Sequence, residues 1–213
     1  MLVDFWNALT ETALMMSIAI VLAALIGIPL GVGLFVTNKG MFWQNQFIQN
    51  ISGTIINIIR SIPYIILLVV LLPFTKLLLG TTTGPIAASV SLTVAAIPFY
   101  ARLVEGSLRE IDTGVIEAAE SCGASPWLII KDVLLPEARP GMIAGLTVTI
   151  ISTLGYSAMA GMVGGGGIGD LAIRFGYYRF ENGIMLATVI ILIIIVQLIQ
   201  YTGDKAAKAV NRR

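Results

Sequence analysis

The stretch EAAESCGASPWLIIKDVLLPEA (residues 117–138) lies between two long apolar segments of the chain. It holds four acidic residues, one lysine and two prolines, whereas the segments on either side are nearly free of charge. Such a compact, charged segment with helix breakers is too small to be a domain and too patterned to be a simple connector. The fold depends on what this segment is and on which side of the apolar segments it lies.

A short helix is predicted in the first half of this region. Asp112 or Thr113 is a suitable N-cap, and the sequence GVIEAAES favours a helix up to about Ser121. Gly123 then stands where a left-handed C-terminal residue is favoured.

A second short helix, PWLIIKDVLL, is predicted to follow. Ser125 and Pro126 form an N-cap and a first-turn proline, and we expect the helix to end at Pro136. Local signals leave two interpretations open for the pair of helices: a hairpin that ties the neighbouring apolar segments together, or a docking surface for another protein.

The composition is that of an integral membrane protein. Of 213 residues, 57% are hydrophobic and only 12% are charged, and the mean hydropathy is +0.92. Soluble domains carry about 25% charged residues, roughly twice as many. The net charge of +1 gives no electrostatic reason to expect a nucleic-acid partner.

The chain lacks the side chains on which many enzymes depend. It has no histidine and a single cysteine, Cys122, so histidine-based catalysis, multi-cysteine metal sites and intramolecular disulfides are excluded. We therefore predict a non-enzymatic chain with no catalytic residue, no metal site and no cofactor of its own.

Five apolar segments approach or exceed the length of about 20 residues that a membrane-spanning helix needs. They are residues 12–36, 51–72, 84–105, 140–161 and 184–202. The N-terminal stretch carries Asp4 and Glu11 but no basic residue, unlike a signal peptide, so the first segment is predicted to be a retained span. We expect one all-α transmembrane domain over residues 1–213, with proline kinks in its first three spans.

The basic residues orient these spans. With the N-terminus outside, ten basic residues lie on the cytoplasmic side and three outside, which accounts for all 13. The reverse orientation inverts that ratio, against the positive-inside rule. The loop of residues 106–139, which contains the charged stretch, and the C-terminus are therefore predicted to be cytoplasmic.

The charged stretch resembles the cytoplasmic EAA loop of bacterial ABC importer permeases, the inner membrane components of binding-protein-dependent transport systems. The family pattern is Glu-Ala-Ala, three residues, Gly, nine residues, an aliphatic residue, any residue and Leu-Pro. Every spacing is met here, with valine in place of the usual isoleucine, at Glu117, Ala118, Ala119, Gly123, Val133, Leu135 and Pro136.

The resemblance implies the type I ABC importer permease fold, with a two-helix coupling loop that docks into a separate ATPase subunit. ATP and Mg²⁺ are then bound by that partner. Ala118 and Ala119 allow close contact, Gly123 makes the turn, and Glu117 supports the loop or pairs with the ATPase. Closure of two ATPase subunits drives alternating access of the spans.

Three further stretches are similar to the permease subunits of methionine importers, a group whose five spans match the number expected here. They are NIIRSIPYIILL (57–68), TVAAIPFYARLVEGSL (93–108) and LGYSAMAGMVGGGGIGDLAIRFGYYRF (154–180). The resemblance implies uptake of L- and D-methionine across the bacterial inner membrane. The partners it implies are a second copy of the chain, two ATPase subunits, an external methionine-binding lipoprotein and the lipid bilayer.

The same resemblance places Tyr156, Ser157 and Met159 near the outer gate, where Met159 is either a flexible apolar seal or a packing residue. Importers of other amino acids or of betaine share the first stretch and the EAA loop, and they are the alternative within this family. The alternative from another class is an ion-coupled secondary transporter, which the lack of Asp and Glu in the central parts of the spans disfavours.

Three smaller features complete the expectations. The run GGGGIG (164–169) has the glycine spacing of a dinucleotide site but follows a span, so a re-entrant or flexible outer loop is predicted. Arg60 either serves a function within the membrane or snorkels in a structural role, and the structural role is favoured. Arg102 and Glu105, one helical turn apart, are predicted to pair.

Overall fold

The computed structural model describes residues 2–211 and is built of helices and short connections. The helices are α1 (Leu2–Val36), α2 (Gln46–Ser61), α3 (Tyr64–Leu79), α4 (Pro85–Arg109), α5 (Thr113–Ser121), α6 (Pro126–Leu128), η1 (Ile129–Leu134), α7 (Leu135–Gly161), α8 (Gly167–Leu171), η2 (Ala172–Tyr177) and α9 (Asn182–Val210). The segments η1 and η2 are π-helical. The prediction of an all-α fold is confirmed.

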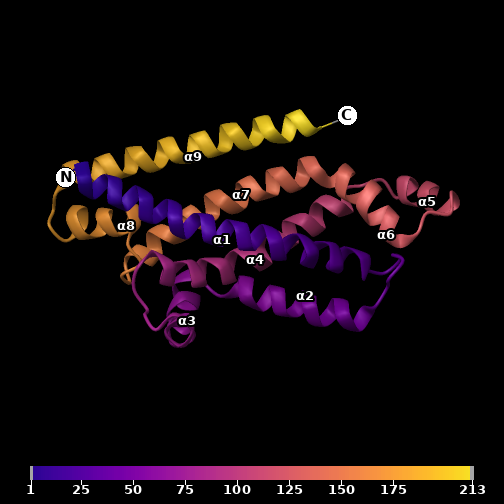
Figure 1. Ribbon diagram of the computed structural model, residues 1–213, viewed down its shortest axis with the longest axis horizontal. Helices are drawn as coiled ribbons and strands as arrows, with labels where there is room; N and C mark the ends of the chain where they lie inside the picture. The colour runs from indigo at the N-terminus through magenta and orange to yellow at the C-terminus, as the bar shows by residue number, and fades with distance from the viewer. Residues whose placement is uncertain (1, 212–213) are drawn as a thin grey trace.

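The two ends of the elongated bundle carry different elements (Figure 1). The N-terminus lies at the end formed by α8, whereas the C-terminus lies at the opposite end, as do α5 and α6. The chain therefore crosses the long axis an odd number of times, as five spans require. The charged stretch and the C-terminus share one end, as the distribution of basic residues predicts.

Helix α4 is held between α1 and α7 by small residues. A Cβ at Gly31 of α1 would lie 2.6 Å from the carbonyl oxygen of Ala101, and a Cβ at Gly141 of α7 would lie 2.7 Å from Ser107 Oγ. Both glycines belong to Gly-xxx-Gly pairs, in GIPLG and GMIAG. Such pairs let helices approach closely where lipid removes the hydrophobic drive to associate.

A continuous apolar core fastens the charged stretch to the bundle. Its buried residues come from α1, α4, the connection to α5, α5 itself, η1 and α7, and include Phe35, Val36, Val104, Leu108, Ile111, Ile116, Ile129, Ile130, Leu134 and Met142. Burial of each large apolar side chain contributes roughly 1.5–3 kcal/mol, so this end is a rigid part of the protein and not a loose loop.

The second expected span, residues 51–72, is not one continuous helix. Helices α2 and α3 are bent by 107° relative to each other. Ile62 between them has an extended backbone with φ −82° and ψ 124°, which a following proline favours, and Pro63 has no N–H to continue α2. Within residues 2–211 the fold thus has four helices that are long and apolar enough to span a membrane, and this bent pair is a broken fifth span or a re-entrant pair.

The second helix of the charged stretch does not end at Pro136, which corrects the sequence-based expectation. Residues Pro126–Gly161 form one helical stretch, in which α6 and η1 lead directly into α7. The N–H of Leu135 bonds to the carbonyl of Ile130, a π-helical step. The wider turn comes just before Pro136, so a residue without an N–H is accommodated without ending the helix.

Candidate functional site

The first helix of the charged end begins with a side-chain cap. Oδ1 of Asp112 accepts a hydrogen bond from the N–H of Gly114 at 2.8 Å. Asp112 is therefore the N-cap of α5, and Thr113 is its first helical residue. The carboxylate also suits the positive end of the helix dipole.

The same helix ends in a Schellman motif around Gly123. The N–H of Ala124 donates to the carbonyl of Ala119 at 3.1 Å, and the N–H of Gly123 donates to the carbonyl of Glu120 at 2.8 Å. Gly123 has φ +78°, and a Cβ there would meet nothing within 4 Å. Glycine is needed for the left-handed backbone, while the space beside it is open in the protomer.

The following helix starts at the predicted cap. The N–H of Leu128 donates to Ser125 Oγ at 3.4 Å, and the N–H of Ile129 donates to the Ser125 carbonyl at 3.0 Å. Ile129 and Ile130 then enter the core against the ends of α1 and α4. We name residues 113–134 the α5–η1 segment.

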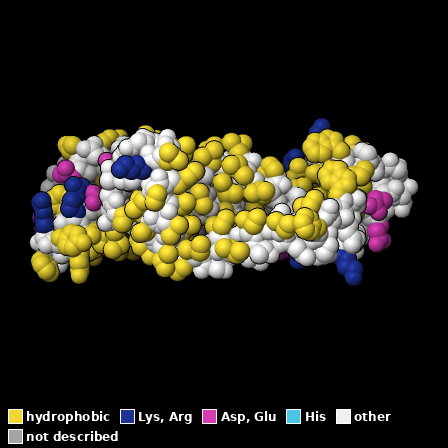
Figure 2. Space-filling view, turned by 90° about the horizontal axis from the view of Figure 1, so that it is seen from below, with side chains coloured by type: hydrophobic (Ala, Val, Ile, Leu, Met, Phe, Trp, Pro, Cys, Tyr) yellow, Lys and Arg dark blue, Asp and Glu magenta, His cyan; other side chains and the backbone are white. Residues whose placement is uncertain are grey.

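The outward side of the α5–η1 segment is partly apolar. Trp127 is 66% exposed, and Val115 and Leu128 are exposed as well. Figure 2 shows hydrophobic and acidic side chains together at the end of the molecule formed by α5 and α6. A rigid motif with an exposed indole and adjacent carboxylates has the chemistry of a protein-docking surface.

The motif residues divide between the two sides of this segment. Glu117, Ala118 and Gly123 are exposed. Three other residues of the motif instead pack against the core, namely Ala119, Val133 and Leu135. The structure thus separates residues available to a partner from residues that fix the segment to the bundle, while Pro136 lines a neighbouring cavity.

A charge network behind the segment was only half predicted. Glu105 is 3% exposed and bonds to Arg102 Nη1 and to Arg109 Nη2, each at 2.6 Å. Arg102 also donates to the Gly53 carbonyl and to Asn57 Oδ1 of α2, each at 3.1 Å. The predicted Arg102–Glu105 pair is confirmed. The second pair, at i and i+4, could have been found by the same spacing rule, whereas the contacts to α2 carry no local signal.

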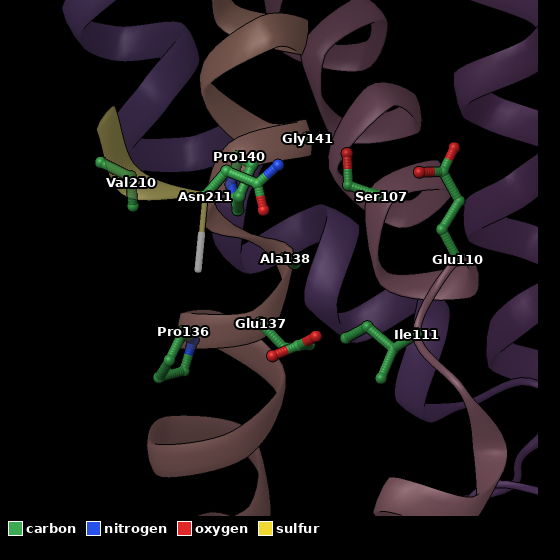
Figure 3. A pocket seen from close by; sticks show the side chains of 10 residues that line it. All are labelled: Ser107, Glu110, Ile111, Pro136, Glu137, Ala138, Pro140, Gly141, Val210 and Asn211. Atoms are coloured by element: carbon green, nitrogen blue, oxygen red, sulfur yellow. The ribbon is translucent and has the colours of Figure 1, made fainter. Parts of the chain in front are cut away.

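A cavity of about 230 Å³ lies where α4, α7 and α9 meet at this end. Figure 3 shows Glu110 beside Ser107 on one wall and Glu137 on another, with Asn211, just after the end of α9, across from Ser107 and above Glu137. The cavity therefore links the base of the α5–η1 segment to the C-terminal helix. No residue lining it other than Pro136 was singled out from the sequence.

A second cavity, of about 140 Å³, lies at the break between α2 and α3. Arg60 and Phe99 line it, and the guanidinium carbon of Arg60 is 5.8 Å from the centre of the Phe99 ring. Tyr64 and Tyr156 also line it, with ring centres 4.8 Å apart and planes 12° apart. Arg60 is thus a cavity residue at the end of α2, and its cation–π contact explains part of its placement.

The three predicted gate residues do not share one surface. Tyr156 belongs to the cavity just described, and Ser157 is buried with its hydroxyl bonded to the Leu154 carbonyl at 2.7 Å. Met159 is 43% exposed. The gate role of these residues stays a prediction.

The glycine run at the opposite end is an ordered turn. Gly164, Gly166 and Gly167 have positive φ, and the N–H of Gly167 donates to Glu11 Oε2 at 2.7 Å. The N–H of Ile168 donates to Thr12 Oγ1 at 2.9 Å. Because a carboxylate of α1 accepts from the start of α8, the place that a phosphate would need is already taken by a negative charge.

Comparison with known proteins shows the family to which the chain belongs. The family model described as binding-protein-dependent transport system inner membrane component matches residues 25–213. The chain belongs to this family of ABC importer permeases. The type I permease fold expected from the EAA loop is confirmed.

Relatives of this permease cover nearly its whole length. It is 47% identical over 207 residues to the probable D-methionine transport system permease protein MetI of Vibrio cholerae, covering 97% of this chain and 92% of the relative. It is 45% identical over 212 residues to the methionine import system permease protein MetP of Bacillus subtilis, covering 100% of this chain and 96% of the relative. The resemblance to methionine importer permeases is confirmed.

Solved structures agree with this assignment. The permease matches a structure of inward-facing conformations of the MetNI methionine ABC transporter with a TM-score of 0.97 and 44% identity, over 99% of this chain and 98% of that one. A crystal structure of an amino acid ABC transporter with histidines matches with a TM-score of 0.73 at 20% identity, over 98% of this chain and 93% of that one. The second likeness shows the shared fold alone.

Proposed function

We propose that this permease is the transmembrane subunit of an ATP-driven importer of methionine, both L and D, in the bacterial inner membrane. The observation that carries the proposal is the α5–η1 segment. It is fixed to the bundle by buried isoleucines and leucines, and it exposes Glu117, Ala118, Gly123 and Trp127 at one end. A rigid motif of this kind transmits the motion of a docked subunit to the spans.

The partners follow from that arrangement. One chain offers one α5–η1 segment, so two closing ATPase subunits require two copies of the permease. In this proposal the ATPase subunits bind ATP and Mg²⁺, and the glycine turn at residues 164–169, which donates to Glu11, takes no part in nucleotide binding. An external methionine-binding lipoprotein delivers the substrate to the opposite end.

Alternating access is then a two-state equilibrium. ATP shifts it only by its different affinity for the open and closed ATPase pair, and the α5–η1 segment carries that free energy to α4 and α7. Because η1, α4 and α7 share one buried core, a movement of the α5–η1 segment also moves α4 and α7. The N-terminus lies outside and the C-terminus in the cytoplasm, in accord with the excess of basic residues at the end that carries α5 and α6.

The substrate assignment rests on relatives that are 45% to 47% identical and are named for methionine or D-methionine transport. Permeases for another amino acid or for betaine are the alternative.

Uptake of labelled L-methionine tests this assignment. Cells that lack methionine uptake would express the permease with its ATPase and binding protein, and the matched control would omit the ATPase. We expect ATPase-dependent uptake that unlabelled L- and D-methionine compete and that leucine and betaine do not. If another solute competes with the uptake and methionine does not, the substrate assignment changes to that solute. Uptake without the ATPase would favour a secondary transporter.

A further inference from the structure

Helix α2 lies at the edge of the bundle, on the side away from α9 (Figure 1). Within residues 46–61 only Ile56 is buried, and it packs against Leu34 of α1 and Ala101 of α4. The break at Pro63 and the bend of 107° turn α3 away from the direction of α2. Apolar packing therefore gives α2 little support, so polar contacts decide which neighbouring helix it follows.

An arginine of α4 provides such contacts. Arg102 Nη2 donates to the Gly53 carbonyl and to Asn57 Oδ1 of α2, each at 3.1 Å. Nη1 of the same guanidinium donates to Glu105 of α4 at 2.6 Å. The planar guanidinium holds several acceptors in a fixed geometry, which the compact ammonium of lysine does not. Arg102 thus joins α2 to α4 through hydrogen bonds that neither an apolar side chain nor a lysine reproduces.

Helix α2 is adapted to this arginine at two positions. Gly53 and Asn57 are four residues apart and therefore lie on the same face of the helix. A Cβ at Gly53 would lie 3.2 Å from Arg102 Nη2, closer than an ordinary van der Waals contact. Glycine inside a helix is less favourable than alanine, and the close approach of the guanidinium accounts for a glycine at this place.

Stability alone does not favour this arrangement. The side chain of Arg102 is 22% exposed, and its Nε is buried with no hydrogen-bond partner among the residues that the structure describes. An unpaired buried donor costs free energy, and replacing a buried ionic group by apolar residues is often neutral or stabilising. Natural proteins break such rules chiefly at functional positions, so a function explains this arginine better than stability does.

Helix α4 carries this contact and the core of the α5–η1 segment on neighbouring faces. Val104 and Leu108 are fully buried in the core that α4 shares with η1. Arg102, Glu105 and Arg109 form the adjacent row of charged side chains, three and four residues apart. A movement of the α5–η1 segment therefore reaches the part of α4 from which Arg102 extends to α2.

We infer that Arg102 is a coupling residue that makes α2 move together with α4 when the docked ATPase subunits close. The inference deepens the proposed function and rests on it. The α5–η1 segment moves α4 through their shared core, and Arg102 passes the movement to α2, the first half of the broken second span. Without this link α4 moves and α2 stays behind, so ATP is hydrolysed without switching the second span. Arg102 is a positioning residue, because it acts through α2 and not on a substrate.

The test compares methionine uptake with ATP hydrolysis in proteoliposomes that contain the complex of permease and ATPase subunits. The binding protein and labelled L-methionine are supplied to them. Arg102→Lys keeps a cation beside Glu105 and removes the fork that reaches α2. We expect uptake to fall at least about tenfold while hydrolysis stays within about twofold of the wild type, because a hydrogen bond to a charged group contributes about a factor of ten or more. A role in stability alone would lower uptake and hydrolysis together.

Asn57→Leu breaks the link from the side of α2 and keeps the inference falsifiable if Arg102→Lys does not assemble, because Asn57 is exposed. Uptake per ATP hydrolysed is expected to fall at least about threefold, since one of the two hydrogen bonds is lost. The double variant with Arg102→Lys is expected to be no worse than Arg102→Lys alone, because both changes break the same link. Asn50→Leu is the matched control and is expected to behave as the wild type, because exposed Asn50 bonds to Gln46 of its own helix at 2.8 Å.

Failure of the link and failure of the proposed function are distinguishable. An unchanged ratio of uptake to hydrolysis in both Arg102→Lys and Asn57→Leu, with ATP-driven methionine uptake intact, overturns the link and leaves the importer. A parallel loss of uptake, hydrolysis and thermal unfolding midpoint also overturns it, because Arg102 is then a structural residue only. If the wild type imports another amino acid instead, the substrate assignment changes, and the same ratio for that amino acid decides on the link.

Discussion

Glu105 is buried between two arginines, and its charge holds α2, α4 and the base of the α5–η1 segment together. Glu105→Gln removes the anion and leaves two guanidinium groups close to each other. We expect a loss of about 2–3 kcal/mol of stability, somewhat less than for a fully buried pair because Arg109 is half exposed. The thermal unfolding midpoint of the purified complex measures it. Glu120→Gln, at an exposed glutamate of α5, is the control and is expected to leave the midpoint unchanged.

Gly169 of α8 lies against the backbone of α7, and a Cβ there would overlap Ala158 Cα. Gly169→Ala must therefore separate the two helices, and we expect it to cost about 1–3 kcal/mol. Gly155→Ala is the matched control, because a Cβ at Gly155 meets nothing within 4 Å and alanine favours the helix. Unfolding midpoints that move in opposite directions are expected, and equal shifts would contradict the close contact.

These residues also show what the sequence could predict. The spacing of Arg102, Glu105 and Arg109 predicts pairing by itself, because side chains three and four residues apart face each other on a helix. The contact of Gly169 with Ala158 depends on how α8 folds back on α7, and a run of glycines is compatible with many turns. Local chemistry was therefore predictable at these positions, and contacts between distant segments were not.

At the scale of elements, the α5–η1 segment is the part most fully predicted. Its caps at Asp112 and Ser125 and its turn at Gly123 are local signals that the structure confirms. The break between α2 and α3 is different. Pro29 and Pro98 lie inside continuous helices, whereas Pro63 ends one, so the presence of proline does not decide the outcome. Packing against neighbouring helices decides it, and one sequence does not reveal that packing.

Gly123 allows strain to be separated from docking. Alanine and leucine both strain the left-handed backbone by about 1–2 kcal/mol, and a Cβ at this position meets nothing within 4 Å in the protomer. If a partner subunit covers Gly123, only leucine has a bulk that clashes with it. We expect Gly123→Ala to lower ATP-dependent uptake modestly and Gly123→Leu to abolish it, with equal amounts of permease in the membrane. Equal uptake by the two variants would show that nothing docks at Gly123.

At the scale of the whole molecule, the long helices leave broad apolar surfaces uncovered. Leu77 of α3 is 86% exposed and Leu186 of α9 is 63% exposed. A soluble monomer does not tolerate such surfaces, so they face lipid or a second copy. Composition and span length predict this environment directly, while the division between lipid and partner depends on an assembly that the isolated chain does not contain.

The single cysteine reports on the orientation of the whole chain. Cys122 is exposed at the end of α5, and the proposed topology places it in the cytoplasm. A membrane-impermeant maleimide should therefore label it in inverted vesicles and not in spheroplasts. In the paired variant Cys122→Ser with Thr81→Cys, the exposed thiol lies in the α3–α4 connection. This connection is at the opposite end of the bundle, because its Gly84 N–H bonds to the Gly164 carbonyl in the glycine turn. The maleimide should therefore label this variant in spheroplasts and not in inverted vesicles. Bound ATPase subunits should also protect Cys122, because it adjoins the docking turn. Labelling of Cys122 in intact spheroplasts would show that the topology is the reverse of the proposed one. The α5–η1 segment could then not contact a cytoplasmic partner.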